Sequence, residues 1–141
     1  MIRAFSSTDM EEVLNIWLSA SVRAHDFVEP DFWAARLDDM RNIYLPSSET
    51  YVYEADGKIK GFFSLHEQTL AAIFVAPEYQ GEGIGQQLMA KAKALRPRLT
   101  LEVYEANRKS VEFYRLCGFA KVAAKVDPHT GHRALVMEYG A

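Results

Sequence analysis

The chain has 141 residues, of which 49% are hydrophobic and 25% charged, the composition of an ordinary globular domain. A formal charge of −3 argues against a nucleic-acid partner, and no apolar run reaches the roughly 20 residues that cross a membrane. The single cysteine, Cys117, excludes an internal disulfide, and the N-terminus lacks the apolar core of a signal peptide. We therefore expect one cytoplasmic domain over residues 1–141, with no membrane partner.

The first half of the chain predicts one strand, two helices and three further strands. Thr8 and Glu11 form the Ser/Thr-x-x-Glu pattern of a capping box, and Pro30 stands where a first helical residue is favoured. An Asp-Gly pair at positions 56 and 57 favours a hairpin turn. The expected elements are a strand at 2–5, helices at 10–20 and 30–44, and strands at 50–54, 59–65 and 70–76, the last covered on both faces.

The second half of the chain alternates helices with strands. A helical stripe ends before Pro97, Asn107 can cap a short helix, and Gly118 is placed to terminate that helix. The expected elements are a helix at 84–95, a strand at 99–103, a short helix carrying Val111 and Tyr114, and strands at 119–126 and 134–139 around a turn. This order predicts an α/β fold with a mixed central sheet flanked by helices.

A glycine-rich segment, Pro77 to Gln86, lies between the expected central strand and the next helix. Backbone N–H groups and the positive end of a helix can hold a phosphate there, and glycines let the backbone approach the anion closely. A dinucleotide fingerprint requires a small residue in place of Gln86, and the Gly-Lys-Ser/Thr of a P-loop is absent. The alternative is a strand-to-helix turn that binds nothing.

Two motifs resemble those of the GNAT acetyltransferase superfamily. Gln80-x-x-Gly83-x-Gly85 is similar to its Arg/Gln-x-x-Gly-x-Gly/Ala signature, in which the turn holds the pyrophosphate of coenzyme A. Between Asn107 and Phe119, an Asn followed by Phe-Tyr and then Gly-Phe resembles the family's other motif. The resemblance covers essentially the whole chain and implies the GNAT fold, with the element order β-α-α-β-β-β-α-β-α-β-β.

The resemblance also implies that acetyl-CoA is the acyl donor. The end of the apolar strand would offer backbone groups to the pantetheine arm, and one N–H would stabilise the oxyanion that develops during the reaction. Asn107 would hydrogen-bond the pantetheine or position its sulfur end, and its alternative role is that of a simple helix cap. The donor-binding residues implied are Phe74, Val75, Gln80, Gly81, Glu82, Gly83, Ile84, Gly85, Gln86 and Asn107.

The expected reaction needs a base and an acid. A lysine amine with a pKa of about 10.4 costs roughly 4.6 kcal/mol to deprotonate at pH 7. Glu102, on the polar side of an alternating strand, is the candidate base, with a structural pairing or a water relay as alternatives. Tyr114 corresponds to the family's usual general acid, and its alternative role is packing against the sheet. We expect Tyr114 to act first as a hydrogen-bond donor, because a phenol is a weaker acid than a thiol by about 2 kcal/mol.

His25 lies in the loop between the first two helices, which borders the acceptor site in relatives. It is a candidate for contacting the substrate or acting as a base, and the alternative is a loop histidine bonded to a neighbour. His66 and Glu67, at the end of a strand, are weaker candidates. His129 and His132 lack the spacing of metal ligands, so no metal site is predicted.

The predicted function is direct transfer of an acetyl group from acetyl-CoA to a primary amine. The preferred acceptor is a protein lysine or N-terminus, as implied by the resemblance to small bacterial single-domain members of the superfamily. The alternatives are a small-molecule amine and a non-catalytic module that binds acyl-CoA. Tyr114 favours an enzyme over the module. The acceptor, the length of the acyl group and the oligomeric state, with a homodimer as one candidate, are left open.

Overall fold

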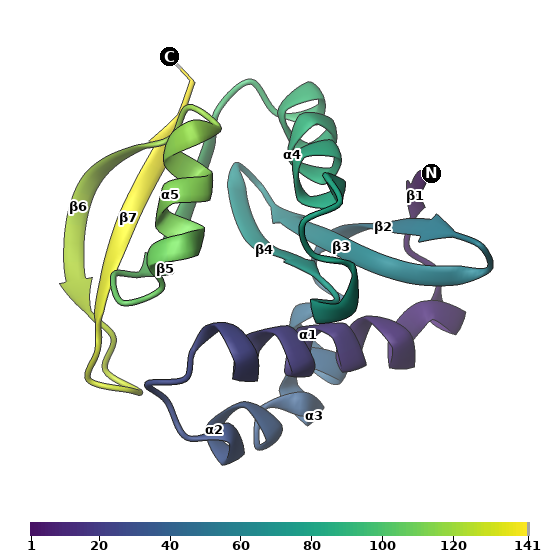
Figure 1. Cartoon of the computed structure of the whole chain (residues 1–141), viewed down its shortest axis with the longest axis horizontal. Coiled ribbons are helices and arrows are strands. Elements are labelled where there is room, and N and C mark those ends of the chain that lie inside the picture. Colours follow the sequence, from purple (N-terminus) through teal and green to yellow (C-terminus); the bar gives the residue numbers. More distant parts are fainter. Residues whose placement is uncertain (141) are drawn as a thin grey trace.

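The computed structural model describes residues 1–140, which form a seven-stranded mixed sheet with helices on both faces (Figure 1). The strands lie in the spatial order β1-β2-β3-β4-β5-β7-β6, with β4 parallel to β5 and the other neighbours antiparallel. The predicted α/β class with a mixed sheet is confirmed. The strands are β1 (Ile2–Ala4), β2 (Glu49–Ala55), β3 (Lys58–His66), β4 (Thr69–Val75), β5 (Leu99–Tyr104), β6 (Ala120–Val126) and β7 (Arg133–Tyr139).

The helices cover the two faces of the sheet separately (Figure 1). Leu88 of α4 belongs to an apolar cluster on one face and Val13 of α1 to a cluster on the other, and both side chains are fully buried. Among residues 1–140, no helix is both long and apolar enough to cross a membrane. The helices are η1 (Ser7–Asp9), α1 (Met10–Ala24), α2 (Pro30–Ala34), α3 (Leu37–Asp39), the π-helix η2 (Met40–Tyr44), η3 (Pro77–Tyr79), α4 (Ile84–Leu95) and α5 (Arg108–Leu116).

The parallel strands β4 and β5 separate soon after they meet. Their register contains one pair, Thr69 with Thr100, and beyond it the two strands diverge (Figure 1). β4 carries an extra residue near this point, because Leu70 and Ala72 oppose successive residues of β3 whereas Ala71 opposes none. A bulge of this kind bends its strand, and the bend helps to open the middle of the sheet.

The prediction of one continuous helix over residues 30–44 is wrong. The structure has the short helices α2 and α3, followed by η2. At the break, Arg36 has φ −101° and ψ 1°, and its guanidinium lies 3.6 Å from the centre of the Phe32 ring. The guanidinium also donates to the Phe32 carbonyl (3.1 Å), a group left without a helical partner where the helix stops. An apolar stripe with helical spacing does not reveal such a break.

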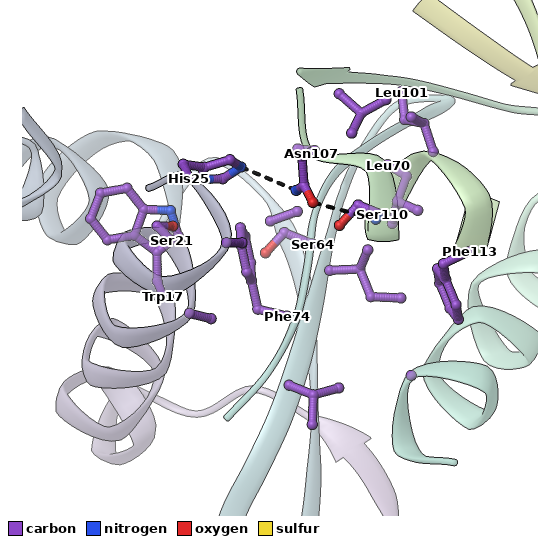
Figure 2. A pocket seen from close by; sticks show the side chains of 18 of the residues that line it. Trp17, Ser21, His25, Ser64, Leu70, Phe74, Leu101, Asn107, Ser110 and Phe113 are labelled. Carbon is purple, nitrogen blue, oxygen red and sulfur yellow. Dashed lines mark hydrogen bonds between the residues drawn. The ribbon is translucent and has the colours of Figure 1, made fainter. Parts of the chain in front are cut away.

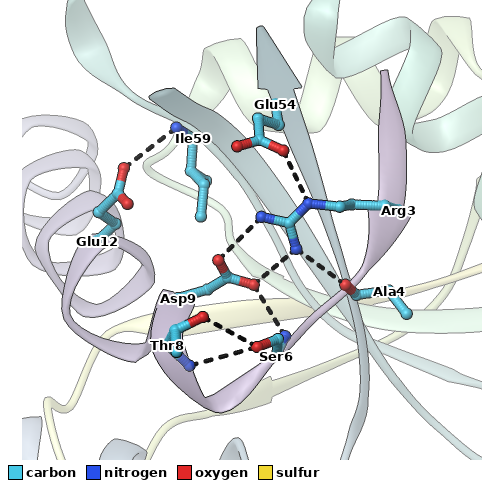
Figure 3. Close-up of polar contacts among 8 residues, drawn as sticks. All are labelled: Arg3, Ala4, Ser6, Thr8, Asp9, Glu12, Glu54 and Ile59. Atoms are coloured by element: carbon cyan, nitrogen blue, oxygen red, sulfur yellow. Dashed lines mark hydrogen bonds and ion pairs between the residues drawn. The ribbon is translucent and has the colours of Figure 1, made fainter. Parts of the chain in front are cut away.

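The capping box lies at Ser6 and Asp9, so its predicted place at Thr8 and Glu11 is wrong. Ser6 is the N-cap residue of η1, and its N–H donates to the Asp9 carboxylate (2.8 Å). The same carboxylate accepts two hydrogen bonds from the Arg3 guanidinium (2.8 and 2.9 Å), as Figure 3 shows. Because Arg3 holds Asp9 in this position, the box forms two residues earlier than the sequence pattern indicates.

The predicted hairpin turn at Asp56 and Gly57, the helix cap at Asn107 and the helix end at Gly118 are confirmed. Asp56 and Gly57 both have positive φ, as the tight hairpin turn between β2 and β3 requires. Asn107 caps α5 by accepting from the Ser110 N–H (3.3 Å). Gly118 follows the helix with a φ of 96° and ends it. These local signals place α5 at the side of the opening between β4 and β5.

Candidate active site

A cavity of about 1460 Å³ occupies the opening between β4 and β5 and extends to α1 (Figure 2). The volume exceeds the roughly 300–1,000 Å³ of an ordinary small-ligand pocket, so there is room for two substrates. All the site residues predicted from the sequence line this cavity except Glu82. The predicted residues in its wall are His25, Phe74, Val75, Gln80, Gly81, Gly83, Ile84, Gly85, Gln86, Glu102, Asn107 and Tyr114.

Beyond the bulge, β4 turns unpaired backbone groups toward the cavity. The Ala76 N–H donates to a carbonyl of β3 (2.9 Å), and alternation along an antiparallel strand directs the backbone groups of Phe74 to β3 as well. The amides of Ile73 and Val75 therefore face the opening. Phe74 lines the cavity, but its backbone groups are not free for the contact that the sequence assigned to them, whereas those of Ile73 face the opening.

The glycine turn presents free amides at the start of α4. Gly81 and Gly83 both have a φ of 85°, which residues with a Cβ rarely adopt, and open space surrounds the position where a Cβ would stand. Gly83 is the N-cap, and no side chain of residues 1–140 caps this helix end. The first N–H groups of α4 and the helix dipole therefore suit the phosphates of a donor molecule.

Tyr114 lies on α5 and lines the cavity. Its ring packs between those of Phe113 and Phe119, with centroids 5.6 and 5.9 Å away. Burial, with a smaller contribution from Cys117, raises the pKa of the Tyr114 phenol well above its usual 10. The phenol therefore stays protonated at neutral pH and can donate a hydrogen bond to an atom in the cavity.

The wall facing α4 across the cavity is aromatic. His25, at the end of α1, stacks on Trp33 of α2, with 4.8 Å between centroids and 28° between ring planes. It meets Tyr104 of β5 edge-on (5.3 Å). Phe27 extends the cluster to His132, in the loop between β6 and β7 (4.8 Å). Three segments that are distant in the sequence thus close this end of the cavity.

His25 joins the aromatic wall to the cap of α5. Because Asn107 Oδ1 accepts the Ser110 N–H, its Nδ2 is left to donate to His25 Nε2 (3.4 Å), and Figure 2 shows this contact. Burial lowers the pKa of His25, although the Ser21 carbonyl partly opposes the shift. The imidazole is therefore neutral at pH 7, and its single proton lies on Nδ1.

Tyr104 and Asp127 form a polar pair at the same end of the cavity, where the phenol donates to the carboxylate. Burial raises the pKa of Tyr104 to about 12, and the hydrogen bond to Asp127 adds to the effect. Burial also acts to raise the pKa of Asp127, but hydrogen bonds from Tyr104 and from the His129 N–H (2.8 Å) outweigh it and lower that pKa. Asp127 thus places a negative charge beside the aromatic wall.

Glu102 lines the cavity, but its carboxylate pairs with Lys125 of β6 (2.9 Å), and both side chains are about half exposed. His66 also lines the cavity, whereas Glu67 and His129 do not. Across residues 1–140, no group of three or more His, Cys, Asp or Glu side chains is placed to hold a metal.

Several residues of this site carry no sequence motif. Ile73 is one apolar residue among several, and only the bulge directs its amide to the opening. In the sequence, the pattern around Trp33 predicts a buried helix position, and the pattern around Asp127 predicts the start of a turn. Tyr104 belongs to an alternating strand, and the sequence pattern gives it no role of its own. The available signal was weak: a tyrosine and an acid at the same open end of the predicted sheet.

The chain matches known acetyltransferases in sequence and in structure. The acetyltransferase (GNAT) family model matches residues 10–119. The peptidyl-lysine N-acetyltransferase YiaC of Escherichia coli strain K12 is 37% identical over 120 residues, covering 84% of this chain and 82% of that protein. The solution structure of apo YjaB from Escherichia coli has a TM-score of 0.87 at 30% identity, covering 100% of this chain and 98% of the other. The PaiA N-acetyltransferase of Thermoplasma acidophilum, solved in complex with coenzyme A, shares the fold with a TM-score of 0.82 at 18% identity and the same coverage.

The opened sheet, the uncapped start of α4 and the large cavity suit an enzyme that holds a phosphate-bearing donor beside an acceptor. The chain belongs to the GNAT family. It is an acetyl-CoA-dependent N-acetyltransferase, in which acetyl-CoA is the acyl donor and an amine is the acceptor. The alternative of a non-catalytic acyl-CoA-binding module is set aside, because the relatives are named as enzymes.

Proposed function

We propose that the chain acetylates the side-chain amine of lysine in proteins or peptides, by direct transfer from acetyl-CoA. The observation that carries this proposal is one continuous cavity that joins the glycine turn to the aromatic wall around His25. Donor and acceptor then meet in the same space, and Cys117, which is not among the cavity residues, takes no part. The 37% identity to a relative named peptidyl-lysine N-acetyltransferase supports lysine as the acceptor.

The donor would bind along the backbone of the opened sheet. The N–H groups of the glycine turn would hold its pyrophosphate, and the edge of β4 would hold the pantetheine arm through Ile73 and Val75. An N–H of this edge is also a fixed donor for the oxyanion that develops at the thioester carbonyl. Asn107 would reach the arm from the start of α5 while still capping the helix.

The proposed chemistry forms a bond between the amine nitrogen and the acetyl carbon and breaks the carbon–sulfur bond. A lysine ammonium gives up two protons in all. One passes to a base and frees the nitrogen lone pair, and the other ends on the departing sulfur, so that coenzyme A leaves as the thiol. Tyr114, which its raised pKa keeps protonated, donates a hydrogen bond to the sulfur. Asp127 and Glu102 supply the negative charge that attracts a lysine ammonium to the acceptor end of the cavity.

We assign the proton lost by the amine to Glu102, directly or through a water molecule. Glu102→Gln should then lower kcat at pH 7 by about 100-fold, the effect of removing a general base. Glu105→Gln is the matched control, because Glu105 also pairs with a cation, Arg133 (3.1 Å), but is not among the cavity residues. Equal rates for the two variants would leave Glu102 as a partner of Lys125 only.

A small-molecule polyamine is the second candidate acceptor, because Asp127 and Glu102 would also attract a polycation. A competition assay separates the two. The wild-type protein receives acetyl-CoA with a lysine peptide, a lysine-free peptide with a free N-terminus, and spermidine at equal concentrations. Mass spectrometry should show the lysine peptide acetylated with a kcat/KM at least about tenfold above that of spermidine. The reverse order would transfer the proposal to a small-molecule acceptor.

A further inference from the structure

Three buried polar side-chain atoms have no hydrogen-bond partner among residues 1–140, and all three lie at the acceptor end of the cavity. They are Ser21 Oγ, Trp33 Nε1 and His25 Nδ1. The Ser21 carbonyl is close enough to affect the His25 ring but does not form a hydrogen bond of good geometry with Nδ1. The residues are more than nine-tenths buried, with 0%, 8% and 8% of their surface exposed. Buried polar atoms without partners are rare, and three around one cavity indicate a ligand that completes them.

These three side chains form one patch, which we call the polar wall. Ser21 lies in the last turn of α1 and His25 is the cap residue that follows this helix, and Figure 2 shows both beside the cavity. Trp33 of α2 stacks against the His25 ring (4.8 Å). The three unpaired atoms therefore lie near one another where α1 and α2 pack, beneath the wall of the cavity.

The hydrogen-bonding character of the polar wall determines what can bind there. Trp33 Nε1 is a donor and never an acceptor, and Ser21 can donate or accept. His25 Nδ1 carries the proton of the neutral ring, because Nε2 accepts from Asn107. The wall thus offers two fixed donors, which suit an oxygen acceptor and do not suit an ammonium group.

The wall also lacks a charge. A buried carboxylate without a counter-charge is strongly disfavoured, whereas a neutral carbonyl oxygen needs only hydrogen-bond donors. Resting on the proposed function, we infer that the polar wall binds a backbone carbonyl oxygen next to the acceptor lysine. The enzyme would then recognise the peptide as well as the amine, and a polyamine, which has no oxygen, would lack this contact.

The three atoms are covered by protein, so substrate entry requires the segment between α1 and α2 to shift. Phe27, in that segment, meets Tyr104 and His132 edge-on (5.5 and 4.8 Å between centroids) and also packs against the apolar cluster of α1. Those contacts connect the segment to the strands across the cavity, and a bound peptide would replace them.

The test compares two acceptors that carry the same alkyl amine. Nα-acetyl-lysine N-methylamide has two peptide carbonyls, and n-butylamine has none. Trp33→Phe and Ser21→Ala each remove one polar group and keep most of the side-chain volume. Each should lower the ratio of kcat/KM for the capped lysine to that for n-butylamine about fivefold to tenfold, mainly through KM, as for one lost hydrogen bond.

Ser19→Ala is the matched control, because Ser19 is an exposed serine on the same helix, and its ratio should equal that of the wild type. Acetyl-CoA binding and circular dichroism check that each variant is folded. If the wild type acetylates the capped lysine and both variants keep the wild-type ratio, the polar wall is overturned while the proposed function stands. If the wild type does not prefer the capped lysine over n-butylamine, the inference is overturned as well; if it acetylates no lysine peptide at all, the proposed function also fails.

Discussion

The two ends of the cavity are built from different parts of the chain. At the donor end, the polar groups belong to the backbone, namely the amides of β4 at Ile73 and Val75 and the first N–H groups of α4 after Gly83. At the acceptor end, they belong to side chains, chiefly those around His25 and Asp127. A backbone amide is the same whichever side chain it carries, whereas a side-chain contact changes with every substitution.

Because of this difference, related proteins can share donor binding while each varies the acceptor that it binds. Both motifs that the sequence displays, the glycine turn and the segment from Asn107 to Phe119, lie at the donor end. The acceptor end is assembled from the α1–α2 segment, the end of β5 and the β6–β7 loop, and no motif marks it. Acceptor choice should therefore follow substitutions in those three segments, while donor binding stays unchanged.

The largest effect should come from placing a negative charge at the donor end of the cavity, where the polar groups belong to the backbone. Gly83→Glu adds a carboxylate where the pyrophosphate would bind and a Cβ at a φ of 85°, so acetyl-CoA affinity should fall at least about 100-fold in titration calorimetry. Gly57→Glu is the matched control, because Gly57 has a φ of 73° in a distant hairpin turn, with open space around it. Similar losses in both variants would mean that backbone strain, and not the phosphate site, accounts for the result.

A change remote from both ends should lower stability and leave binding intact. Asp9→Ala removes a carboxylate that accepts two hydrogen bonds from Arg3 and one from the Ser6 N–H, and the free energy of unfolding in urea should fall by about 2 kcal/mol. The Arg3 hydrogen bonds lower the pKa of Asp9 from its usual 3.8, so this contribution is fully present above pH 3.8 and is lost as the pH falls further, through the lowered pKa. Glu11→Ala, which breaks an exposed pair with Arg41, should change stability little. Equal stabilities for the two variants at pH 7 would contradict the structural role of Asp9.

At the donor end, Tyr114 is a polar side chain among groups that otherwise belong to the backbone. Tyr114→Phe should lower kcat at least about tenfold, roughly 1.4 kcal/mol in the barrier, and leave the acetyl-CoA dissociation constant unchanged. Tyr139→Phe serves as the control, because Tyr139 packs against the same apolar cluster but is not among the cavity residues. If kcat is unaltered in Tyr114→Phe, the phenol only packs against the sheet.

The smallest effect tests the contact between the two ends. Asn107→Asp keeps a good cap for α5 but sets a carboxylate beside His25 Nε2, which favours the charged imidazole. The pKa of His25, lowered by burial in the wild type, should rise by about 1 in an NMR titration. A pKa that does not move would show that the two side chains are apart in solution.

The sequence predicted the local geometry of the glycine turn and of the Asn107 cap better than the long-range contacts around His25, for physical reasons. The turn around Gly83 and the cap at Asn107 depend on local backbone geometry, which neighbouring residues specify. The choice between Phe74 and Ile73 depends on one bulge residue, Ala71, and its effect can be followed along the strand. The Thr100 N–H donates to the Gln68 carbonyl (3.0 Å), so the backbone of Gln68 faces β5. With regular alternation, the backbone of Phe74 would face the same way, toward the opening. The extra residue shifts the alternation by one, so the backbone of Ile73 faces the opening instead.

At the acceptor end, the contacts join residues that are far apart in the chain. His25 and Asn107 are separated by 82 positions, and neither position indicates the other. The apolar stripe from Trp33 onward predicted a single helix, because residue spacing alone does not show where the helix is interrupted by a side chain such as Arg36. Long-range pairing of this kind requires the assembled fold.

Because β4 and β5 share a single register pair, the stability of the folded chain should depend on whether acetyl-CoA is bound. The sheet consists of two antiparallel halves joined through Thr69 and Thr100, and a donor lying along β4 would add hydrogen bonds that only the folded chain can make. A ligand at 100 times its dissociation constant stabilises the folded state by about 2.7 kcal/mol. Resistance to proteolysis would therefore rise and fall with the acetyl-CoA pool, and an abundant metabolite would extend the lifetime of the enzyme that consumes it.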